Sequence, residues 1–377
     1  MSLRKLRSGF KCWEFRFRFQ VNMEIKGTER VLVCPLGWGL GHASRMVPVV
    51  TFLLRKGCTV IIAGDASTNE FVKKRFPSVE CIHFPSFSVR LSSSRFQILY
   101  LALVAIKVFL RTASEKREFR QILEKHSINL TISDNRYGLF SNQIPCVLVT
   151  HQLSPIFPKP FGFLKRVGER FVRRHAEQFT ECWIPDNPEG FSFSGKLSQP
   201  QRLPKNSIRI GLLSRFSELK NVEADKRWEL VAMVSGPEPH RTILEQQVVK
   251  LSVREKVKTL IIAGQPLNNS TFQLNEYVTI EPNLDDESIA KVLRGAKFVI
   301  CRAGYSTIMD LLALNRSALL VPTPGQTEQE YLAKRMKSST IFQIINQKNV
   351  SNLSLVQFEG SDFSPGTTNR FFPKTNY

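Results

Sequence analysis

The sequence lacks several features that would place it in a common class. It has no run of about 20 apolar residues, so a transmembrane helix is not expected. Its seven cysteines stand singly, with no CxxC pair and no His/Cys cluster at zinc-site spacing. This pattern favours reduced thiols in a cytosol-like compartment and no structural metal. No helix-turn-helix, zinc-finger or RNP-like motif is present, so no nucleic-acid partner is expected.

Positive charge is abundant instead. The 377 residues include 53 Lys and Arg against 32 Asp and Glu, which gives a formal net charge of +21. Such a field attracts anionic lipid, nucleic acid or phosphorylated small molecules, and charge alone does not choose among them. The length suits two domains, and a hydrophobic content of 42% is sufficient for ordinary globular cores.

Two segments leave alternatives open. Residues 1–22 form a basic extension without the apolar stretch and cleavage site of a signal peptide, and their alternating aromatic residues suit an edge strand. Met23 is an alternative start, because a normal cytosolic N-terminus and a first strand follow it directly. Residues 98–110 are apolar but too short to span a bilayer and contain Lys107, so they favour a buried helix over one that dips into a membrane.

Strand-like and helix-like patterns alternate from residue 30 onward, which predicts an α/β protein with parallel sheets. The pattern runs to about residue 186, gives way to a Ser-, Gly- and Pro-rich linker at 189–216, and then restarts. Two doubly wound, Rossmann-like units with an interdomain cleft are therefore expected. The predicted divisions are the extension 1–22, an N-terminal Rossmann-like domain 23–210, a C-terminal Rossmann-like domain 211–350 and a tail 351–377.

The stretch "GWGLGH" follows the first predicted strand and opens a helix. Its glycines, Gly37, Gly39 and Gly41, allow close approach of the backbone to a ligand and aim N–H groups at negative charge. The dinucleotide-binding fingerprint has glycine where this chain has His42, which argues against a dehydrogenase, although Asp65 follows the second strand where a ribose-binding acid would lie. At a helix N-terminus the dipole favours neutral imidazole, and a neutral histidine can act as a general base.

A later segment makes the pattern specific. "GWGLGHASR" (37–45) together with "CRAGYSTIMDLLALNRSALLVPTPGQTEQEYLA" (301–333) resembles the two halves of a MurG-like glycosyltransferase of the GT-B fold. The resemblance implies transfer of a sugar from a nucleotide diphosphate sugar such as UDP-N-acetylglucosamine to an acceptor hydroxyl. This chain has Asp310 where the family has Glu, and Glu330 where it has the second of two glutamines, so the family's sugar preference does not transfer automatically.

The C-terminal segment would hold the donor. A helix that begins after Gly304 presents free N–H groups and hydroxyls to a diphosphate, and Asp310 is expected to face outward and accept hydrogen bonds from ribose hydroxyls. The resemblance assigns Gln329 and Glu330 to the donor sugar. The expected donor-binding residues are Ser235, Gly236, Arg302, Gly304, Tyr305, Ser306, Thr307, Asp310, Gln329 and Glu330.

The N-terminal domain would supply the base and the acceptor side. His42 or a neighbouring acid, for which Asp134 is the candidate, would take the proton of the acceptor hydroxyl. Arg136 is expected to contact an acidic or phosphorylated acceptor. The expected acceptor-side residues are Gly39, Gly41, Arg45, Asn135, Arg136, His151 and Gln152.

The function expected from the sequence is therefore an inverting, metal-independent glycosyltransferase without a cofactor. A basic, Phe-containing segment at 156–178 predicts contact with an anionic membrane surface and a lipid-linked acceptor, and hence a cytoplasmic protein that is peripheral on the inner face of the membrane. A solvated basic helix is the plainer interpretation of the same segment. A sugar-nucleotide 2-epimerase of the same fold and a non-catalytic basic module that binds nucleotide or lipid remain as alternatives.

Overall fold

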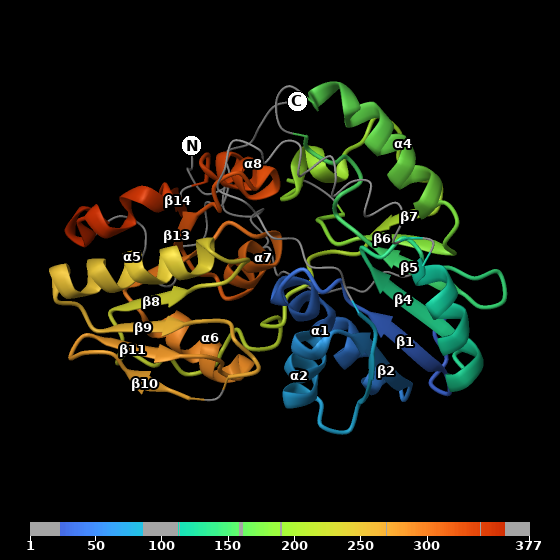
Figure 1. Ribbon diagram of the computed structural model, residues 1–377, viewed down its shortest axis with the longest axis horizontal. Helices are drawn as coiled ribbons and strands as arrows, with labels where there is room; N and C mark the ends of the chain where they lie inside the picture. Colours follow the sequence, from blue (N-terminus) through green and yellow to red (C-terminus); the bar gives the residue numbers. More distant parts are fainter. Residues whose placement is uncertain are drawn as a thin grey trace, which may run out of the picture.

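The computed structural model describes residues 23–85, 112, 114–157, 161–188, 191–268, 270–339 and 341–358. In these ranges the chain forms two seven-stranded sheets, each covered by helices, which lie side by side in Figure 1 with the first in blue to green and the second in yellow to red. The extension 1–22, the apolar segment 98–110 and residues 359–377 of the expected tail lie outside the described residues.

The first domain surrounds a sheet with the order β3-β2-β1-β4-β5-β6-β7. Residues 114–126 add a further helix. Its elements are β1 (Arg30–Cys34), α1 (Leu40–Arg55), β2 (Thr59–Gly64), α2 (Ala66–Arg75), β3 (Glu80–His83), β4 (Leu130–Asp134), β5 (Cys146–Val149), η1 (Phe161–Leu164), α4 (Lys165–Ala176), β6 (Glu181–Ile184), η2 (Gly195–Ser198) and β7 (Ser207–Arg209).

The second domain has the order β10-β11-β9-β8-β12-β13-β14. Its elements are β8 (Leu230–Met233), α5 (His240–Glu255), β9 (Thr259–Ile262), β10 (Phe272–Gln273), β11 (Val278–Glu281), α6 (Asp286–Gly295), β12 (Phe298–Arg302), α7 (Tyr305–Ala313), β13 (Ala318–Val321), α8 (Thr327–Met336), β14 (Phe342–Ile344), η3 (Gln347–Asn352) and η4 (Leu355–Phe358). Every pairing in the two sheets is parallel except that of β10 with β11.

The central strands form because they are short apolar runs that can be buried on both faces. All residues of β4, β5 and β12 are buried, as parallel strands covered by helices on each side require. The predicted α/β class with two doubly wound domains is therefore confirmed. Among the described residues, no helix combines the length and apolar character needed to cross a membrane.

The segment expected to be an irregular linker is more ordered than predicted. Its residues Ser207–Arg209 form β7, which pairs with β6 and completes the first sheet. Asp186, which is fully buried, accepts hydrogen bonds from the hydroxyls of Ser192 and Ser194 and from the backbone N–H of Phe193. The prolines and serines of this segment suggest an irregular loop. The residue that orders it, Asp186, lies outside the segment, so the composition of the segment alone does not reveal the order.

The chain then crosses between the domains. Ile210 and Leu213 pack in the core of the first domain, whereas Leu212 and Phe216 pack in the core of the second. Gly211 lies among them with φ +84°, a conformation that favours glycine. The crossing segment is thus anchored in both cores.

Candidate active site

The N-termini of α1 and α7 meet between the two domains. The hydroxyl of Ser306 in α7 donates to the carbonyl oxygen of Gly41 in α1 at 2.8 Å. A Cβ atom at Gly41 would lie 3.5 Å from that hydroxyl, an ordinary contact distance, so this approach does not itself require glycine. Gly39 caps α1 with φ +88° and Gly304 caps α7, and neither helix has a side-chain cap. The structure therefore brings the two glycine-containing loops together, as the sequence predicts (Figure 1).

A buried ionic cluster lies directly behind the first loop. His42 Nδ1 is 3.0 Å from Asp134 Oδ2, and Asp134 is fully buried at the end of β4. Arg45, one turn along α1 from His42, donates from Nε to the same oxygen at 2.9 Å and from Nη2 to Asp134 Oδ1. Burial alone would raise the pKa of Asp134, but the charges and hydrogen bonds of Arg45 and His42 outweigh it and hold that pKa below its ordinary value.

The cluster continues into the second domain. Arg45 Nη1 lies 2.9 Å from His151 Nδ1, and His151 Nε2 lies 2.8 Å from Glu328 Oε1 in the first turn of α8. The side-chain amide of Gln152 donates to the other oxygen of Glu328. An unbroken series of polar contacts therefore joins His42 in the first domain to Glu328 in the second.

These contacts define the charge states. Burial lowers the pKa of His151, and Arg45 lowers it further, while Glu328 opposes the effect without cancelling it. For Glu328, burial would raise the pKa, but the hydrogen bond and charge of His151 outweigh this and lower it. The arrangement therefore favours a neutral His151 beside an ionised Glu328.

Tyr305 closes the cluster from the second domain. Its ring stacks on His151, and its hydroxyl donates to the carbonyl oxygen of Pro185. Burial raises the pKa of Tyr305 well above its ordinary value. The sequence predicts that Tyr305 contacts the donor diphosphate. In the structure its hydroxyl and ring contact the first domain, so only its backbone N–H at the start of α7 remains for a contact with the diphosphate.

Asp310 does not face outward as expected, so that part of the prediction is wrong. Its side chain is buried and accepts from Ser214 Oγ at 2.6 Å and from Arg215 Nε at 3.1 Å. Arg215 also bonds Asp286 at 3.0 Å, and Arg75 of α2 pairs with that same carboxylate. Burial raises the pKa of Asp310 despite Arg215 and Ser214. A ribose would reach this carboxylate only after Arg215 and Ser214 have moved.

Two arginines expected at the ligand are also buried. Arg136 forms an ion pair with Glu115 at 2.9 Å, and its guanidinium lies over the ring of Phe84 at 4.0 Å. Arg302 donates to the backbone carbonyl oxygens of His240 and Val321, and burial lowers its pKa to about 10. The expected contact of Arg136 with an acceptor is contradicted by this packing, because its guanidinium is held inside the first domain.

The remaining predicted residues lie around the ends of the strands. Gln329 is buried and accepts from the backbone N–H of Thr323 at 2.9 Å, while the exposed Glu330 accepts from that of Gly325 at 2.8 Å. Ser235 and Gly236 follow β8, and Thr307 is in the first turn of α7. Asn135 follows β4 with φ +54°, and its buried Oδ1 has no hydrogen-bond partner among the described residues.

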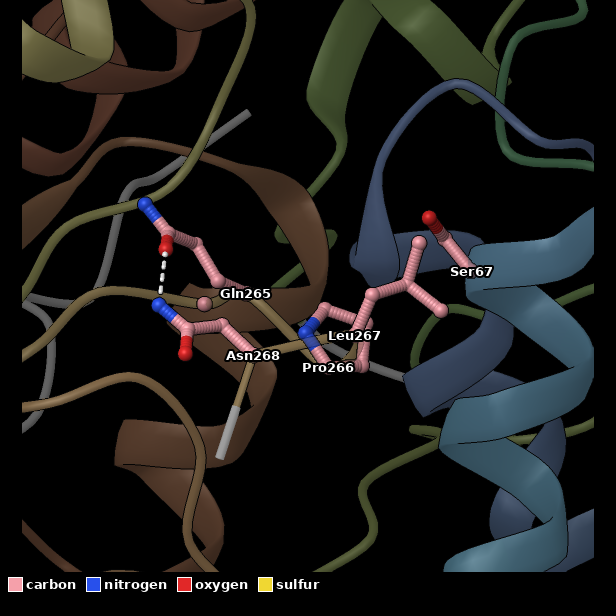
Figure 2. A pocket seen from close by; sticks show the side chains of 6 residues that line it. Ser67, Gln265, Pro266, Leu267 and Asn268 are labelled. Carbon is pink, nitrogen blue, oxygen red and sulfur yellow. Dashed lines mark hydrogen bonds between the residues drawn. The ribbon is translucent and has the colours of Figure 1, made fainter. Parts of the chain in front are cut away.

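Two cavities lie near these strand ends. One of about 770 Å³ is bordered by Glu330 and by Lys334, Lys337 and Lys348 of the second domain. The other, of about 380 Å³, lies between Ser67 of α2 and the loop 264–268 after β9; Figure 2 shows Leu267 directed toward Ser67. Neither cavity includes His42. Asp65, the candidate ribose-binding acid of a dehydrogenase, caps α2 by accepting from Thr68 N at 2.8 Å.

Sequence reasoning missed Glu328, Ser214 and Arg215. Glu328 precedes Gln329 and lies in the first turn of a helix, where acidic residues commonly complement the dipole, so its sequence context did not distinguish it. Ser214 and Arg215 lie in the segment expected to be an irregular linker. No group of three or more His, Cys, Asp or Glu side chains that could hold a metal ion occurs within the described ranges.

The arrangement can perform acid–base chemistry next to an anion-binding helix end. A histidine paired with a buried carboxylate is suited to accept a proton, and the uncapped N-terminus of α7 is suited to stabilise a departing diphosphate. The residues His42, Asp134, Arg45, His151 and Gln152 come together as predicted; their individual roles stay predictions.

Several known proteins are similar in sequence to this chain. Residues 239–358 match the model of the glycosyltransferase family 28 C-terminal domain. UDP-N-acetylglucosamine–N-acetylmuramyl-(pentapeptide) pyrophosphoryl-undecaprenol N-acetylglucosamine transferase of Thermoanaerobacter sp. (strain X514) is 24% identical over 337 residues, covering 82% of this chain and 85% of its own. An uncharacterized glycosyltransferase of Methanosarcina acetivorans is 26% identical over 317 residues, covering 80% of this chain and 79% of its own.

Solved structures share the architecture. Spinosyn rhamnosyltransferase SpnG, complexed with thymidine diphosphate, superposes with a TM-score of 0.56 at 16% identity, covering 88% of this chain and 90% of that one. The glycotransferase of kitacinnamycin gives a TM-score of 0.56 at 13% identity, with 89% of each chain covered. The protein is therefore a glycosyltransferase with the GT-B fold. Residues 239–358 of its second domain match the family 28 C-terminal domain.

Proposed function

We propose that the protein is an inverting glycosyltransferase that moves a sugar from a UDP-sugar, such as UDP-N-acetylglucosamine, to the hydroxyl of a lipid-linked acceptor. The observation that carries this proposal is the pairing of His42 with the buried Asp134 at 3.0 Å, next to the N-terminus of α7. A base and an anion-stabilising helix end at one domain junction are the two elements that such a transfer needs.

The proposed reaction is a single displacement. The oxygen of the acceptor hydroxyl attacks the anomeric carbon as His42 Nε2 takes its proton, and a glycosidic bond forms. The bond between that carbon and the diphosphate oxygen breaks, and the nucleoside diphosphate leaves with the electron pair. Attack opposite the leaving group inverts the anomeric configuration.

The leaving diphosphate would be held by the backbone N–H groups of Gly304 to Thr307 and by the hydroxyl of Thr307. The hydroxyl of Ser306 would join them only by leaving the carbonyl oxygen of Gly41, to which it donates. Ser235 and Gly236 after β8 would contribute from the neighbouring strand end. We propose that these groups neutralise the leaving group without an obligatory metal. Activity that disappears with a chelator and returns with magnesium would contradict this part.

The choice of donor rests on the relatives. The transferase of Thermoanaerobacter is named for UDP-N-acetylglucosamine and a pyrophosphoryl-undecaprenol acceptor, and SpnG was solved with a nucleoside diphosphate. Glu330 borders the cavity beside α8, so its carboxylate would select among sugar hydroxyl patterns in that part of the site.

The proposed acceptor side involves the surface of α4. Phe163, just before this helix, is 73% exposed and Val167 is 64% exposed, although both are apolar. Arg166, Arg170 and Arg174 recur at helical spacing on the same exposed side. An apolar stripe bordered by arginine suits an anionic membrane, and we propose that the enzyme works as a peripheral protein at the inner face of the cytoplasmic membrane.

The experiment is a thermal-shift panel of UDP, GDP, CMP and NAD, followed by an assay of nucleoside diphosphate release from UDP-N-acetylglucosamine with polyprenyl-diphosphate acceptors. Stabilisation by UDP and acceptor-dependent release support the proposal. Release or epimerisation that needs no acceptor would favour a 2-epimerase, and a response to NAD alone would overturn the transferase.

A further inference from the structure

The contacts of Arg45 pose a problem for the proposed base. Arg45 Nη2 lies 2.9 Å from His42 Nδ1, while Asp134 Oδ2 lies 3.0 Å from the same nitrogen. A guanidinium only donates hydrogen bonds, and a carboxylate only accepts them. His42 Nδ1 therefore cannot satisfy both neighbours at once. If it donates to Asp134, Nε2 carries a lone pair and can act as a base; if it accepts from Arg45, the proton of a neutral ring is on Nε2 and the ring cannot.

His151 determines which alternative holds. Its Nδ1 faces Arg45 Nη1 at 2.9 Å and must accept, so the proton of the neutral ring is on Nε2. That proton is donated to Glu328 at 2.8 Å. With its lone pair directed at Arg45, His151 accepts from Nη1 and holds the guanidinium beside Asp134, whose Oδ1 accepts from the Nη2 that also faces His42.

Among the described residues of this cluster, Glu328 and Tyr305 come from the second domain, and both contact His151. His42, Arg45, Asp134 and His151 all belong to the first domain. Separation of the domains would therefore remove the acceptor of His151 Nε2–H and the ring stacked on it, and would leave the first-domain contacts without the partner that fixes them.

We propose that Glu328 is a positioning residue that couples domain closure to the tautomer of His42. On closure, Glu328 accepts from His151 Nε2–H and holds the imidazole with Nδ1 toward Arg45. His151 Nδ1 then retains Arg45, and His42 Nδ1 is left to donate to Asp134. His42 Nε2 becomes the free base only in the closed enzyme. On opening, Glu328 and Tyr305 no longer hold the His151 ring toward Arg45, so Arg45 loses this acceptor and turns to His42 Nδ1, which moves the proton of His42 to Nε2. The inference deepens the proposed function and rests on His42 as its base.

The test uses Glu328→Gln, which keeps the size of the side chain but presents an amide N–H to one of its two donors. We expect kcat to fall on the order of 10- to 100-fold with little change in the donor KM, because positioning of the base is lost while the donor site is kept. Glu287→Gln is the matched control: Glu287 is also in the first turn of a helix of the second domain, and its side chain pairs with Lys291 on the surface at 2.7 Å.

A second readout does not depend on turnover. The chain has only six histidines, so ¹⁵N NMR of labelled imidazoles in the UDP-bound protein can assign the tautomer of His42. We expect the proton on Nδ1 in the wild type and in Glu287→Gln, and a population with the proton on Nε2 in Glu328→Gln. Glu328→Asp, which keeps a carboxylate, should recover part of kcat.

The outcomes separate the two proposals. An unchanged kcat and an unchanged His42 tautomer in Glu328→Gln overturn the role of Glu328, even if the wild type transfers sugar and His42→Ala does not. Absence of transfer by the wild type overturns the proposed function, and the NMR comparison then still decides whether Glu328 controls His42. A Glu328→Gln protein that loses kcat while its His42 tautomer stays unchanged also overturns the coupling.

Discussion

The imidazole of His151 lies flat against the phenol ring of Tyr305, with ring centroids 4.1 Å apart and an interplanar angle of 10°. One ring belongs to each domain, so the junction is defined by stacking as well as by charge. Tyr305 also follows Gly304 directly at the start of the proposed diphosphate-binding helix. The residue that contacts the first domain is therefore rigidly connected to the donor side.

Replacement of Tyr305 separates stacking from hydrogen bonding. Tyr305→Phe keeps the ring but leaves the carbonyl oxygen of Pro185 without its donor, so we expect kcat close to that of the wild type and a loss of about 1–3 kcal/mol in the free energy of unfolding. Tyr305→Ala, which also removes the ring, should lower both kcat and the free energy of unfolding. Urea unfolding and steady-state kinetics measure the two effects, and equal kcat values in both variants would show that stacking is unimportant.

His42→Ala tests the proposed base. We expect kcat to fall by about 10²- to 10⁴-fold, the usual contribution of a general base, while the donor KM stays within about 2-fold. His83→Ala is the control, because His83 is an exposed histidine at the end of β3, away from this cluster. Steady-state release of UDP is the measurement. A wild-type kcat in His42→Ala would show that another residue is the base.

The cluster predicts that acid destabilises the fold in two stages. The folded-state pKa of His151 lies below its ordinary value of 6.5, so the unfolded chain binds the proton first and stability falls as the pH drops through about 6.5. The pKa values of Asp134 and Glu328 are also lowered, which places their loss of stability below about pH 4.5. Both contributions are fully present at pH 7.5.

Urea unfolding between pH 7.5 and 3.5 measures this dependence. His151→Gln should reduce the loss of stability near pH 6.5 and leave the loss below about pH 4.5 unchanged. Part of the loss near pH 6.5 should remain, because burial also lowers the pKa of His240. The ionisable groups that face His151 are Arg45, His42 and Glu328. A wild-type protein that gains stability on acidification from pH 7.5 to 5.5 would contradict the assigned charge states.

Arg136→Met distinguishes a structural arginine from an acceptor-binding one. Removal of one partner of the buried pair with Glu115 leaves the carboxylate unpaired, so we expect a loss of about 3–5 kcal/mol in the free energy of unfolding. The KM for the acceptor should not change. The double variant with Glu115→Gln should be less destabilised than the sum of the two single variants. A stable Arg136→Met with a raised acceptor KM would restore the role predicted from the sequence.

Charge reversal on α4 tests the membrane surface. Arg170→Glu with Arg174→Glu should reduce co-sedimentation with phosphatidylglycerol vesicles by at least about 10-fold, since each basic residue near an anionic surface contributes about 1 kcal/mol. Binding to phosphatidylcholine vesicles should stay weak. Lys250→Glu with Lys258→Glu, which are exposed lysines of the second domain, is the charge-matched control. Equal losses in both pairs would mean that net charge alone drives binding.

The sequence predicts the strands and helices of both domains well, because parallel strands that are buried on both faces are continuous apolar runs, such as Leu130–Asp134. It also places His42, Asp134 and His151 at one edge, since the carboxyl ends of parallel strands meet there. The short edge strands β7, β10 and β14 were not predicted; they have two or three residues each and no clear period.

The burial of charged side chains could not be predicted from sequence. Arg136 and Asp310 look like exposed ligand-binding groups until their partners are known, and those partners, Glu115 and Arg215, are 21 and 95 residues away. Glu328 and its partner His151 are 177 residues apart in the sequence. No local pattern reports pairings at such separations, whereas strand ends follow from local composition.

The crossing segment at 210–216 restricts how the two domains can move. Because Leu212 is buried in one core and Leu213 in the other, neither end of the segment can swing without extracting a side chain from its own domain. Gly211 cannot act as a free hinge, because Leu213 follows it and returns to the core of the first domain, so rotation there would extract Leu213. A change in the angle between the domains should therefore move this segment least and the far side of the junction most, and a proline at Gly211, whose φ of +84° a proline ring does not allow, would distort the segment.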